Sequence, residues 1–410
     1  MKQHASGRDF CTGGTHMSIA ERVLRFCLAA AVSALALAGP ACSGPPAAGA
    51  EKPLPAQSPI GALEPFAMLR GYMPTGVAVS RQGRIFLSFP RWDAEMLYTV
   101  GELTPEGAVK PYPDVALNLP SPDDPAGGLC SVQSVVTDER DRLWLLDTGR
   151  ILWGPAPAGG PKLVGVDLQT NAVFKTVPMP TDAVGPDSYM NDVQVDPSQG
   201  TEGFAYITDS SRGGLIVVDI GAGTVMHRLR DHPSTQAAEQ LVVVEGQPLY
   251  VQPTPDAPPE LFKVAADGLA LSRDGGTLYY CPLTNRRLYS ISTAALRDPG
   301  LSEDQLAAQV KDLGPKPAVD GMALDDKGRL YLTAFEHNAI MRRLPNGMIE
   351  TVAQDPRLLW PDSLAIGGDG YLYVTSNQLE RMPRFHAGKD LRRRPFVLFR
   401  TRMDAAPAPP

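Results

Sequence analysis

Six segments of this chain repeat one pattern, and that repetition constrains its fold more than any other feature. Each copy has a short apolar strand that starts beside a small or acidic residue, then a turn, then a second strand rich in aromatic residues. The copies begin at Thr75, Gln133, Asn191, Asp267, Asp320 and Asp362. Repeats made of strand pairs are typical of β-propellers, in which each repeat forms one blade. We therefore predict an all-β protein with a single six-bladed propeller.

Additional strand-like segments follow most copies. LYTVGEL and AVKPYPD follow the first copy, and KLVGVDL and AVFKTVP follow the second. Two more strands per repeat complete the four-stranded antiparallel sheet of a propeller blade. After Asn377 only LERMPRF and FVLFRTR remain, so we expect the termini to complete the last blade, with residues 63–70 as the other contributor.

The second strands carry an aromatic residue at an equivalent position, and we expect most of these rings to pack between adjacent blades. They are Phe86, Trp144, Tyr206, Tyr279, Tyr331 and Tyr373.

The first fifty residues have the pattern of an export signal. Arg22 and Arg25 precede a 13-residue apolar run, Phe26–Ala38, which is shorter than the ~20 residues of a membrane-spanning helix. Cleavage after Ala41 would leave Cys42 as a lipid anchor, whereas cleavage after residue 50 would release a soluble protein. We expect a secreted or periplasmic product, with residues 1–50 as leader, 51–402 as propeller and 403–410 as a flexible tail. Either Met1 or Met17 fits as the start.

Charge and cysteine content narrow the partners and the chemistry. The net charge of −7 gives no reason to expect nucleic acid as a partner, because nucleic-acid binding favours a basic stripe. Two cysteines, Cys130 and Cys281, fall within the propeller region. They form either one disulfide, as export permits, or two separate buried thiols.

Neighbouring strands of a blade run antiparallel, so the starts of first strands and the ends of second strands share one face of the ring. Four side chains at first-strand starts, Asn191, Asp267, Asp320 and Asp362, would converge on the central opening. Their oxygens suit calcium or another divalent ion, and equally an organic cation. The alternative is that each caps the turn into its own strand.

Other residues map to the same face. Arg91 with Trp92 would stack a flat ligand or pack on a blade rim, and Asn377 ends a second strand. His337 would act as a base or stand in an exposed loop. The longest gap between copies, residues 230–264, contains the hairpin-like LVVVEGQPLYV, and it is either a lid or a surface loop.

IFLSFPRW, LCSVQSVVTDERDRLWLLDTGR, FAYITDSSRGGLIVVDI and DGMALDDKGRLYLTAFEHNAI resemble segments of the yellow / major royal jelly protein family, and the resemblance extends over about residues 63–400. It implies a secreted six-bladed propeller. The family is associated with dopachrome conversion, with binding of biogenic amines and with storage, so the resemblance implies the fold more strongly than one activity.

A more distant resemblance is to the gluconolactonase and senescence-marker propellers, which hold a central divalent metal with a Glu, two Asn and an Asp. Asn191 and Asp320 match two of those ligands, and Thr75 stands where the Glu is expected. The departure weakens the expectation of metal-dependent lactone hydrolysis, because a carboxylate ligand and candidate base are lost.

We predict an exported propeller that binds a small aromatic or amine ligand at the central opening, with dopachrome-type isomerisation as the candidate activity. Asp320 or Asp362 would pair with the ligand cation, and a carboxylate or His337 would move the proton. One alternative is a lactonase-type hydrolase with a divalent ion at Asn191 and Asp320. The other is a scaffold without catalytic activity.

Overall fold

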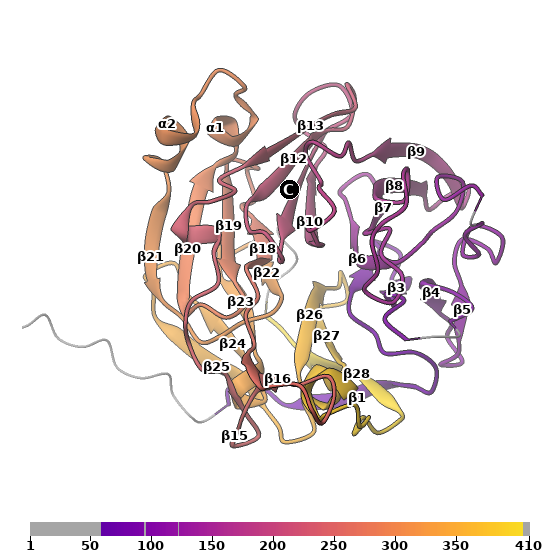
Figure 1. Cartoon of the computed structure of the whole chain (residues 1–410), viewed down its shortest axis with the longest axis vertical. Coiled ribbons are helices and arrows are strands. Elements are labelled where there is room, and N and C mark those ends of the chain that lie inside the picture. Colours follow the sequence, from indigo (N-terminus) through magenta and orange to yellow (C-terminus); the bar gives the residue numbers. More distant parts are fainter. Residues whose placement is uncertain (1–58, 94–95, 122, 405–410) are drawn as a thin grey trace, which may run out of the picture. The chain divides into compact units, whose positions relative to one another are not determined.

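Six four-stranded antiparallel sheets stand in a ring (Figure 1), which confirms the predicted fold. The structure is a computed structural model that describes residues 59–93, 96–121 and 123–404. The predicted leader, its two cleavage sites and Cys42 lie outside the described residues. Five blades are built from consecutive strands, innermost strand first.

The bounds of the strands in the first three blades are β2 (Val77–Val79), β3 (Ile85–Ser88), β4 (Val100–Leu103) and β5 (Val109–Pro111); β6 (Val132–Thr137), β7 (Arg142–Asp147), β8 (Lys162–Asp167) and β9 (Ala172–Pro178); and β10 (Met190–Asp196), β11 (Phe204–Asp209), β12 (Leu215–Asp219) and β13 (Thr224–Arg228). Those of the next two blades are β18 (Ala266–Leu271), β19 (Thr277–Pro282), β20 (Arg287–Ser292) and β21 (Lys311–Pro315), and β22 (Met322–Leu324), β23 (Leu330–Ala334), β24 (Ala339–Arg343) and β25 (Ile349–Gln354).

Both ends of the described chain contribute to the sixth blade. Its order is β26 (Pro361–Ile366), β27 (Tyr371–Ser376), β28 (Phe396–Arg402) and then β1 (Leu63–Leu69) on the outside. The register runs from Leu63 opposite Thr401 to Leu69 opposite Phe396, and Figure 1 shows the indigo β1 beside the yellow β28. The prediction that residues 63–70 help to complete the last blade is confirmed.

In three blades the repeated aromatic residue, Trp144, Tyr331 or Tyr373, donates a hydrogen bond to a turn aspartate. Five of the six rings are buried, and Tyr279 is half-buried. Trp144 Nε1 donates to Asp138 Oδ2 at 2.8 Å, and the Tyr373 hydroxyl donates to Asp369 Oδ2 at 2.7 Å. Each aspartate lies in the turn between the first and second strands, so the polar atom of an otherwise apolar ring is satisfied inside the blade.

The insertion at residues 230–264 forms two short hairpins rather than the single one suggested by LVVVEGQPLYV. They pair β14 (Val243–Val244) with β15 (Gln247–Pro248), and β16 (Tyr250–Val251) with β17 (Glu260–Leu261). The remaining elements are short helices: η2 (Pro233–Thr235), α1 (Thr293–Arg297), α2 (Glu303–Ala307), η3 (Phe335–His337), η4 (Leu379–Arg381) and η5 (Pro383–Phe385).

Two further observations concern the predicted boundaries. Of the predicted tail, the structure describes Met403, whose N–H donates to the Gly370 carbonyl, and Asp404, which pairs with Arg329 at 2.7 Å. Within the described part of the chain, no helix has the length and apolar character needed to cross a bilayer.

Candidate functional site

The inner strands are irregular where they begin, and this irregularity places the candidate residues. In β10 the register shifts between Met190 and Val193, so that Asn191 and Asp192 are left out of the regular pairing. Similar shifts occur near the starts of β6, β18 and β26. A bulge turns two adjacent side chains in directions that a regular strand would not allow. Each of these strand starts can therefore present two residues toward the axis.

Glycines let neighbouring inner strands approach each other at this level. A Cβ atom on Gly268 would lie 2.2 Å from the Asp320 carbonyl oxygen, and one on Gly321 would lie 2.5 Å from the Asp362 carbonyl oxygen. Contacts that short are impossible for a side chain, so only glycine fits at these two positions. The close approach brings Asp267, Asp320 and Asp362 of successive blades together.

Four aspartates form a cluster at this end of the ring. Asp267, Asp320 and Asp362 are at least nine-tenths buried, and Asp192 is half-buried. Their described partners are neutral N–H and O–H donors: Asn191 for Asp267 at 2.6 Å, Trp360 for Asp320 at 2.7 Å, Asn377 for Asp362, and Ser134 for Asp192. One oxygen of Asp267 has no hydrogen-bond partner among the described residues.

Burial and mutual repulsion raise the pKa values of the cluster. Burial and the charge of Asp320 raise the pKa of Asp192 to about 8, and burial raises the pKa of Asp320 to about 6. The pKa values of Asp267 and Asp362 are raised well above the ordinary range by the same two effects, burial first. Carboxylates that share a site cannot all ionise, so the cluster retains protons near neutral pH.

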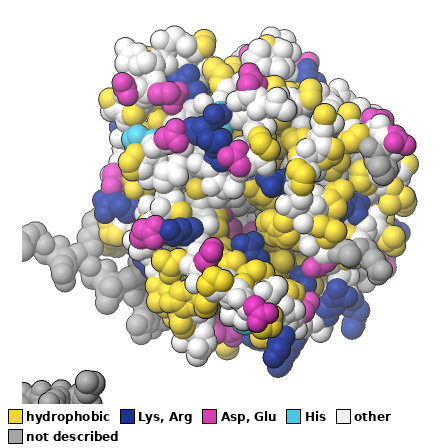
Figure 2. All heavy atoms as spheres, in the orientation of Figure 1, with side chains coloured by type: hydrophobic (Ala, Val, Ile, Leu, Met, Phe, Trp, Pro, Cys, Tyr) yellow, Lys and Arg dark blue, Asp and Glu magenta, His cyan; other side chains and the backbone are white. Residues whose placement is uncertain are grey.

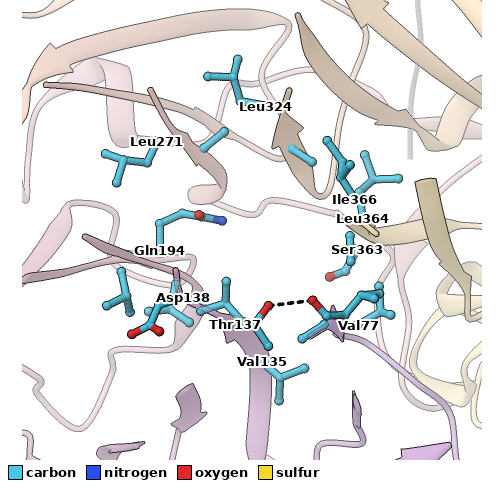
Figure 3. A pocket seen from close by; sticks show the side chains of 18 of the residues that line it. Val77, Val135, Thr137, Asp138, Gln194, Leu271, Leu324, Ser363, Leu364 and Ile366 are labelled. Atoms are coloured by element: carbon cyan, nitrogen blue, oxygen red, sulfur yellow. Dashed lines mark hydrogen bonds between the residues drawn. The ribbon is translucent and has the colours of Figure 1, made fainter. Parts of the chain in front are cut away.

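A cavity of about 480 Å³ lies between the inner strands (Figure 3). Ser134, Asp192 and Ser363 line it near the strand starts, and its walls mix polar and aliphatic side chains, the latter including Val135, Leu271, Leu324, Leu364 and Ile366. At the opposite end of the ring, where the inner strands end (the strand finishes), the cavity is lined by Arg81, Glu139, Arg273 and Asp326. Of the four clustered aspartates, Asp192 is the one that faces this cavity.

Aromatic residues cover the strand-start end. Trp360, which is fully buried, stacks on Phe335 at 4.2 Å between ring centroids and meets Phe262 edge-on. Val242, Val244 and Leu249 of the insertion are buried in the same apolar cluster. The insertion therefore packs against the aromatic residues at this end, and its role as a lid stays a prediction.

A second aromatic group stands over the first three blades. The Trp153 ring stacks on Trp92 at 4.7 Å and on Tyr189 at 5.6 Å. Trp92 Nε1 donates to the Tyr189 hydroxyl at 2.7 Å, and that hydroxyl donates to Gln133 Oε1 at 2.9 Å. Because Gln133 lies at the start of its inner strand, this group also stands at the strand-start end.

The structure separates the remaining predicted site residues. Arg91 is buried, and its guanidinium donates to the carbonyls of Cys130, Met96 and Asn118, so it fixes loops and has no free face for a ligand. Trp92 takes part in the aromatic group just described. His337 is exposed in the turn after β23, which matches the exposed-loop alternative.

Cys130 and Cys281 are free, buried thiols in different blades. The predicted disulfide is therefore wrong, and the alternative of two separate thiols holds. Burial raises the pKa of Cys130 to about 11 and also raises that of Cys281. The shared face is too coarse a criterion for a disulfide, which needs Cα atoms within about 7 Å.

The donor set does not fit the predicted calcium or other divalent ion at Asn191 and Asp320. Asn191 turns its amide N–H toward Asp267, and the indole N–H of Trp360 occupies one oxygen of Asp320. Thr75 is fully buried, and its hydroxyl donates to the Gln133 carbonyl at 2.7 Å. Among residues 59–93, 96–121 and 123–404, no group of three or more His, Cys, Asp or Glu side chains could hold a metal ion.

Sequence reasoning missed Asp192, Tyr189, Trp360 and Arg384. Asp192 was hidden because a regular strand alternates its side chains, which would send it away from the axis when Asn191 faces inward. The adjacent Asn and Asp were the one signal of a bulge with two functional positions. Tyr189, Trp360 and Arg384 lie outside the repeated strand pairs, where the pattern gives no register.

Comparisons with known proteins agree with this architecture. A family model described as "Major royal jelly protein" matches residues 130–406. Protein yellow of Drosophila madeirensis is 24% identical over 361 residues, covering 80% of this chain and 60% of that protein. Major royal jelly protein 3 of Apis mellifera is 28% identical over 297 residues, covering 67% of this chain and 52% of the other. This chain thus spans less than two thirds of either relative.

Two solved structures share the fold at low identity. A luciferin-regenerating enzyme aligns with a TM-score of 0.51 at 14% identity, covering 85% of this chain and 97% of its own. A gluconolactonase from Xanthomonas campestris aligns with a TM-score of 0.50 at 12% identity, covering 83% and 89%. The family model matches more than half of the residues and is supported by both curated relatives, so this chain belongs to the major royal jelly protein family.

Proposed function

We propose that this protein binds a small organic cation, an aromatic or aliphatic amine, in the cavity between the inner strands, with Asp192 as the contact for the ammonium group. The observation that carries the proposal is the cluster of four aspartates without a described ion-pair partner at one end of a cavity that has aliphatic walls beside it. Buried charges are normally paired. A ligand cation would supply the missing partner.

The raised pKa values of the four aspartates also indicate that a positive charge is missing beside them. Because burial and like charge hold protons on the cluster, a cation beside Asp192 would lower these pKa values and release a proton. The attraction between the ligand cation and the ionised Asp192 carboxylate then favours binding. The aliphatic walls suit the hydrocarbon or aromatic body of the amine, and the cavity volume falls in the range of about 300–1,000 Å³ typical of small-molecule sites.

The proposal extends to a dopachrome-type isomerisation. Such a reaction needs one group that donates a proton and another that accepts it, and pairs of groups with separated pKa values suit that task. For a ligand that places no ammonium group beside Asp192, that carboxyl, with a pKa of about 8, would hold a proton at neutral pH, and Asp320, with a pKa of about 6, would be ionised. His337 has no part in this scheme because it is exposed in a turn.

We further propose that the protein is exported, on the strength of Arg22, Arg25 and the apolar run Phe26–Ala38. Cleavage after residue 50 would release it, and cleavage before Cys42 would anchor it by a lipid.

Titration calorimetry with tryptamine, dopamine and butylamine tests the binding proposal. We expect saturable binding of at least one amine, and a loss of about tenfold or more in Asp192→Asn, in line with roughly 1.5–3 kcal/mol for a charged hydrogen bond. Asp326→Asn, at the other end of the cavity, is the matched control and should bind normally. Absence of binding by all three amines would favour a scaffold that takes no small cation. Equal affinity of Asp192→Asn and wild type would move the site elsewhere.

A further inference from the structure

Arg384 occupies an unusual place on the strand-start face. It belongs to η5, and its guanidinium lies 5.0 Å from the centroid of the Trp153 ring, 5.1 Å from that of Phe385 and 5.9 Å from that of Phe262. It thus stands between the aromatic group of Trp153 and the aromatic cover that contains Phe262. Rings on several sides remove water from a guanidinium without replacing its hydrogen bonds.

Every other described arginine that lies over an aromatic ring also has a polar side-chain partner. The partners are Glu102 for Arg84, Asp138 for Arg142, Tyr206 for Arg297, Asp355 for Arg357 and Glu64 for Arg400. Among the described residues, the Arg384 guanidinium has no hydrogen bond and no ion pair; its described contacts are the three rings and, through its backbone carbonyl, Gln252. Its five N–H donors are therefore available to an acceptor from outside the chain.

The local charge favours an anion as that acceptor. The charges of Arg150 and Arg384 both act on the Tyr189 hydroxyl, and the acid that also acts on it, Asp267, is kept protonated by burial and by its neighbours. A planar guanidinium matches a carboxylate through two parallel hydrogen bonds, which a single-atom anion cannot reproduce. An ammonium group, by contrast, would be repelled here.

Trp153 supplies a flat surface beside Arg384. Its side chain is 38% exposed, although it stacks on Trp92, and the backbone at Leu152 and Trp153 has positive φ values of 51° and 61°. Bulky residues adopt that conformation at a cost of about 1–2 kcal/mol each. The hydrogen bond from Leu152 N–H to the Arg91 carbonyl and the stacking of the ring hold it in place. Trp92, Tyr189 and the Arg384 guanidinium lie against this ring, and the part that stays exposed is suited to contact with another ring.

On the face that Figure 2 shows, hydrophobic side chains gather over the region where Figure 1 labels β3 and β7, with isolated basic side chains among them. Ile151, Leu152 and Leu97 are among the exposed large hydrophobic residues, at 40%, 53% and 68%. An apolar surface next to an unpaired arginine suits a ligand that is flat and apolar at one end and anionic at the other.

We propose that Arg384 and Trp153 form a second binding site, which takes a flat aromatic carboxylate. The carboxylate accepts two hydrogen bonds from the Arg384 guanidinium, and the aromatic body packs against the exposed part of the Trp153 ring. The site is separate from the cavity of Asp192, and it selects the opposite charge. It therefore stands whether or not amines bind in the cavity.

The test uses the full chain and compares two ligands of nearly the same shape, one an anionic acceptor and the other a neutral amide. Indole-3-carboxylate should bind about 10-fold to 100-fold more tightly than indole-3-carboxamide by titration calorimetry, which is the effect of a charged hydrogen bond. In Arg384→Gln the two ligands should bind equally. Trp153→Leu should weaken both ligands by a similar factor, because it removes stacking and leaves the guanidinium.

Arg400→Gln is the matched control, because Arg400 also lies over aromatic rings but is paired with Glu64. It should leave the preference for the carboxylate unchanged, and so should Asp192→Asn. The proposal is overturned if wild type does not distinguish the two ligands, a measurement that needs no variant, or if Arg400→Gln removes the preference as completely as Arg384→Gln does.

Discussion

The two ends of the central channel are built on opposite principles. At the strand starts, bulges and close-packed glycines crowd four aspartates together, and aromatic residues cover them. At the strand finishes, the inner strands simply end, and the cavity reaches Arg81, Glu139, Arg273 and Asp326 without such a cover among its lining residues. Both ends come from the same six repeats. The difference teaches that the repeat builds the ring, while departures from regular pairing at one end build the site.

Removing the aromatic cover should have the largest effect. Trp360→Ala deletes a fully buried ring that stacks on Phe335, and it leaves Asp320 without its indole donor. We expect a loss of about 3–5 kcal/mol in the free energy of unfolding, measured by urea denaturation. Trp360→Phe keeps most of the ring and removes the N–H, so it should cost about 1–3 kcal/mol. A loss below about 1 kcal/mol for Trp360→Ala would show that the cover adds little to stability.

Adding one methyl group at each end compares the ends directly. Gly268→Ala would place a Cβ atom 2.2 Å from the Asp320 carbonyl oxygen, whereas a Cβ atom on Gly368 at the strand finishes meets nothing within 4 Å. We expect Gly268→Ala to lower the free energy of unfolding by about 1–3 kcal/mol, as overpacking does. Gly368→Ala should stay within about 0.5 kcal/mol of wild type. Both variants are measured by thermal and urea unfolding. If Gly268→Ala and Gly368→Ala lower stability equally, the strand starts are no more tightly packed than the strand finishes.

Over any single pH unit, the smallest effect should appear in the pH dependence of stability. The pKa values of Asp192 and Asp320 are raised in the folded state to about 8 and about 6, so between about pH 4 and those values the folded chain holds protons that the unfolded chain has lost. Their contribution to stability is therefore greatest below the unfolded pKa and declines as the pH rises. One such proton changes the free energy of unfolding by at most about 1.4 kcal/mol per pH unit.

Asp192→Asn should make that decline shallower between about pH 5 and pH 8, because it removes one of the titrating groups. The difference between wild type and variant isolates Asp192 from the other acids of the chain, and it is measured by urea denaturation at several pH values. Parallel pH profiles for the two proteins would show that Asp192 titrates as an ordinary exposed carboxyl.

The fold was predictable because its signals are local and repeated. The strand pairs, their aromatic residues and the long gap after Arg228 all follow from residues that lie close together in the sequence, and alternation within each strand gives its buried face. Even the return of residues 63–70 to the last blade could be inferred, because too few strands remained after Asn377. The position of Asn191, Asp267, Asp320 and Asp362 at one end of the ring follows from the antiparallel order.

The chemistry of the site was less predictable because it depends on irregular backbone and on distant loops. No alternation rule places Asp192 next to the cavity, since a bulge reverses its direction. Arg91 has the residue type of a ligand-binding group, but its donors are consumed by three carbonyls. Arg384 gave no signal in the sequence, since its significance lies in the absence of a hydrogen-bond acceptor among the residues that the structure describes.

The pairing of β1 with β28 has a consequence for the order of events in synthesis. The strand that contains Leu63 is made early, and its partner, which contains Thr401, is made more than three hundred residues later. Five blades can form from consecutive strands as they emerge, but the sixth must wait for Phe396–Arg402. Until then the growing chain carries an unpaired strand, so ring closure is a late step that follows formation of the other five blades.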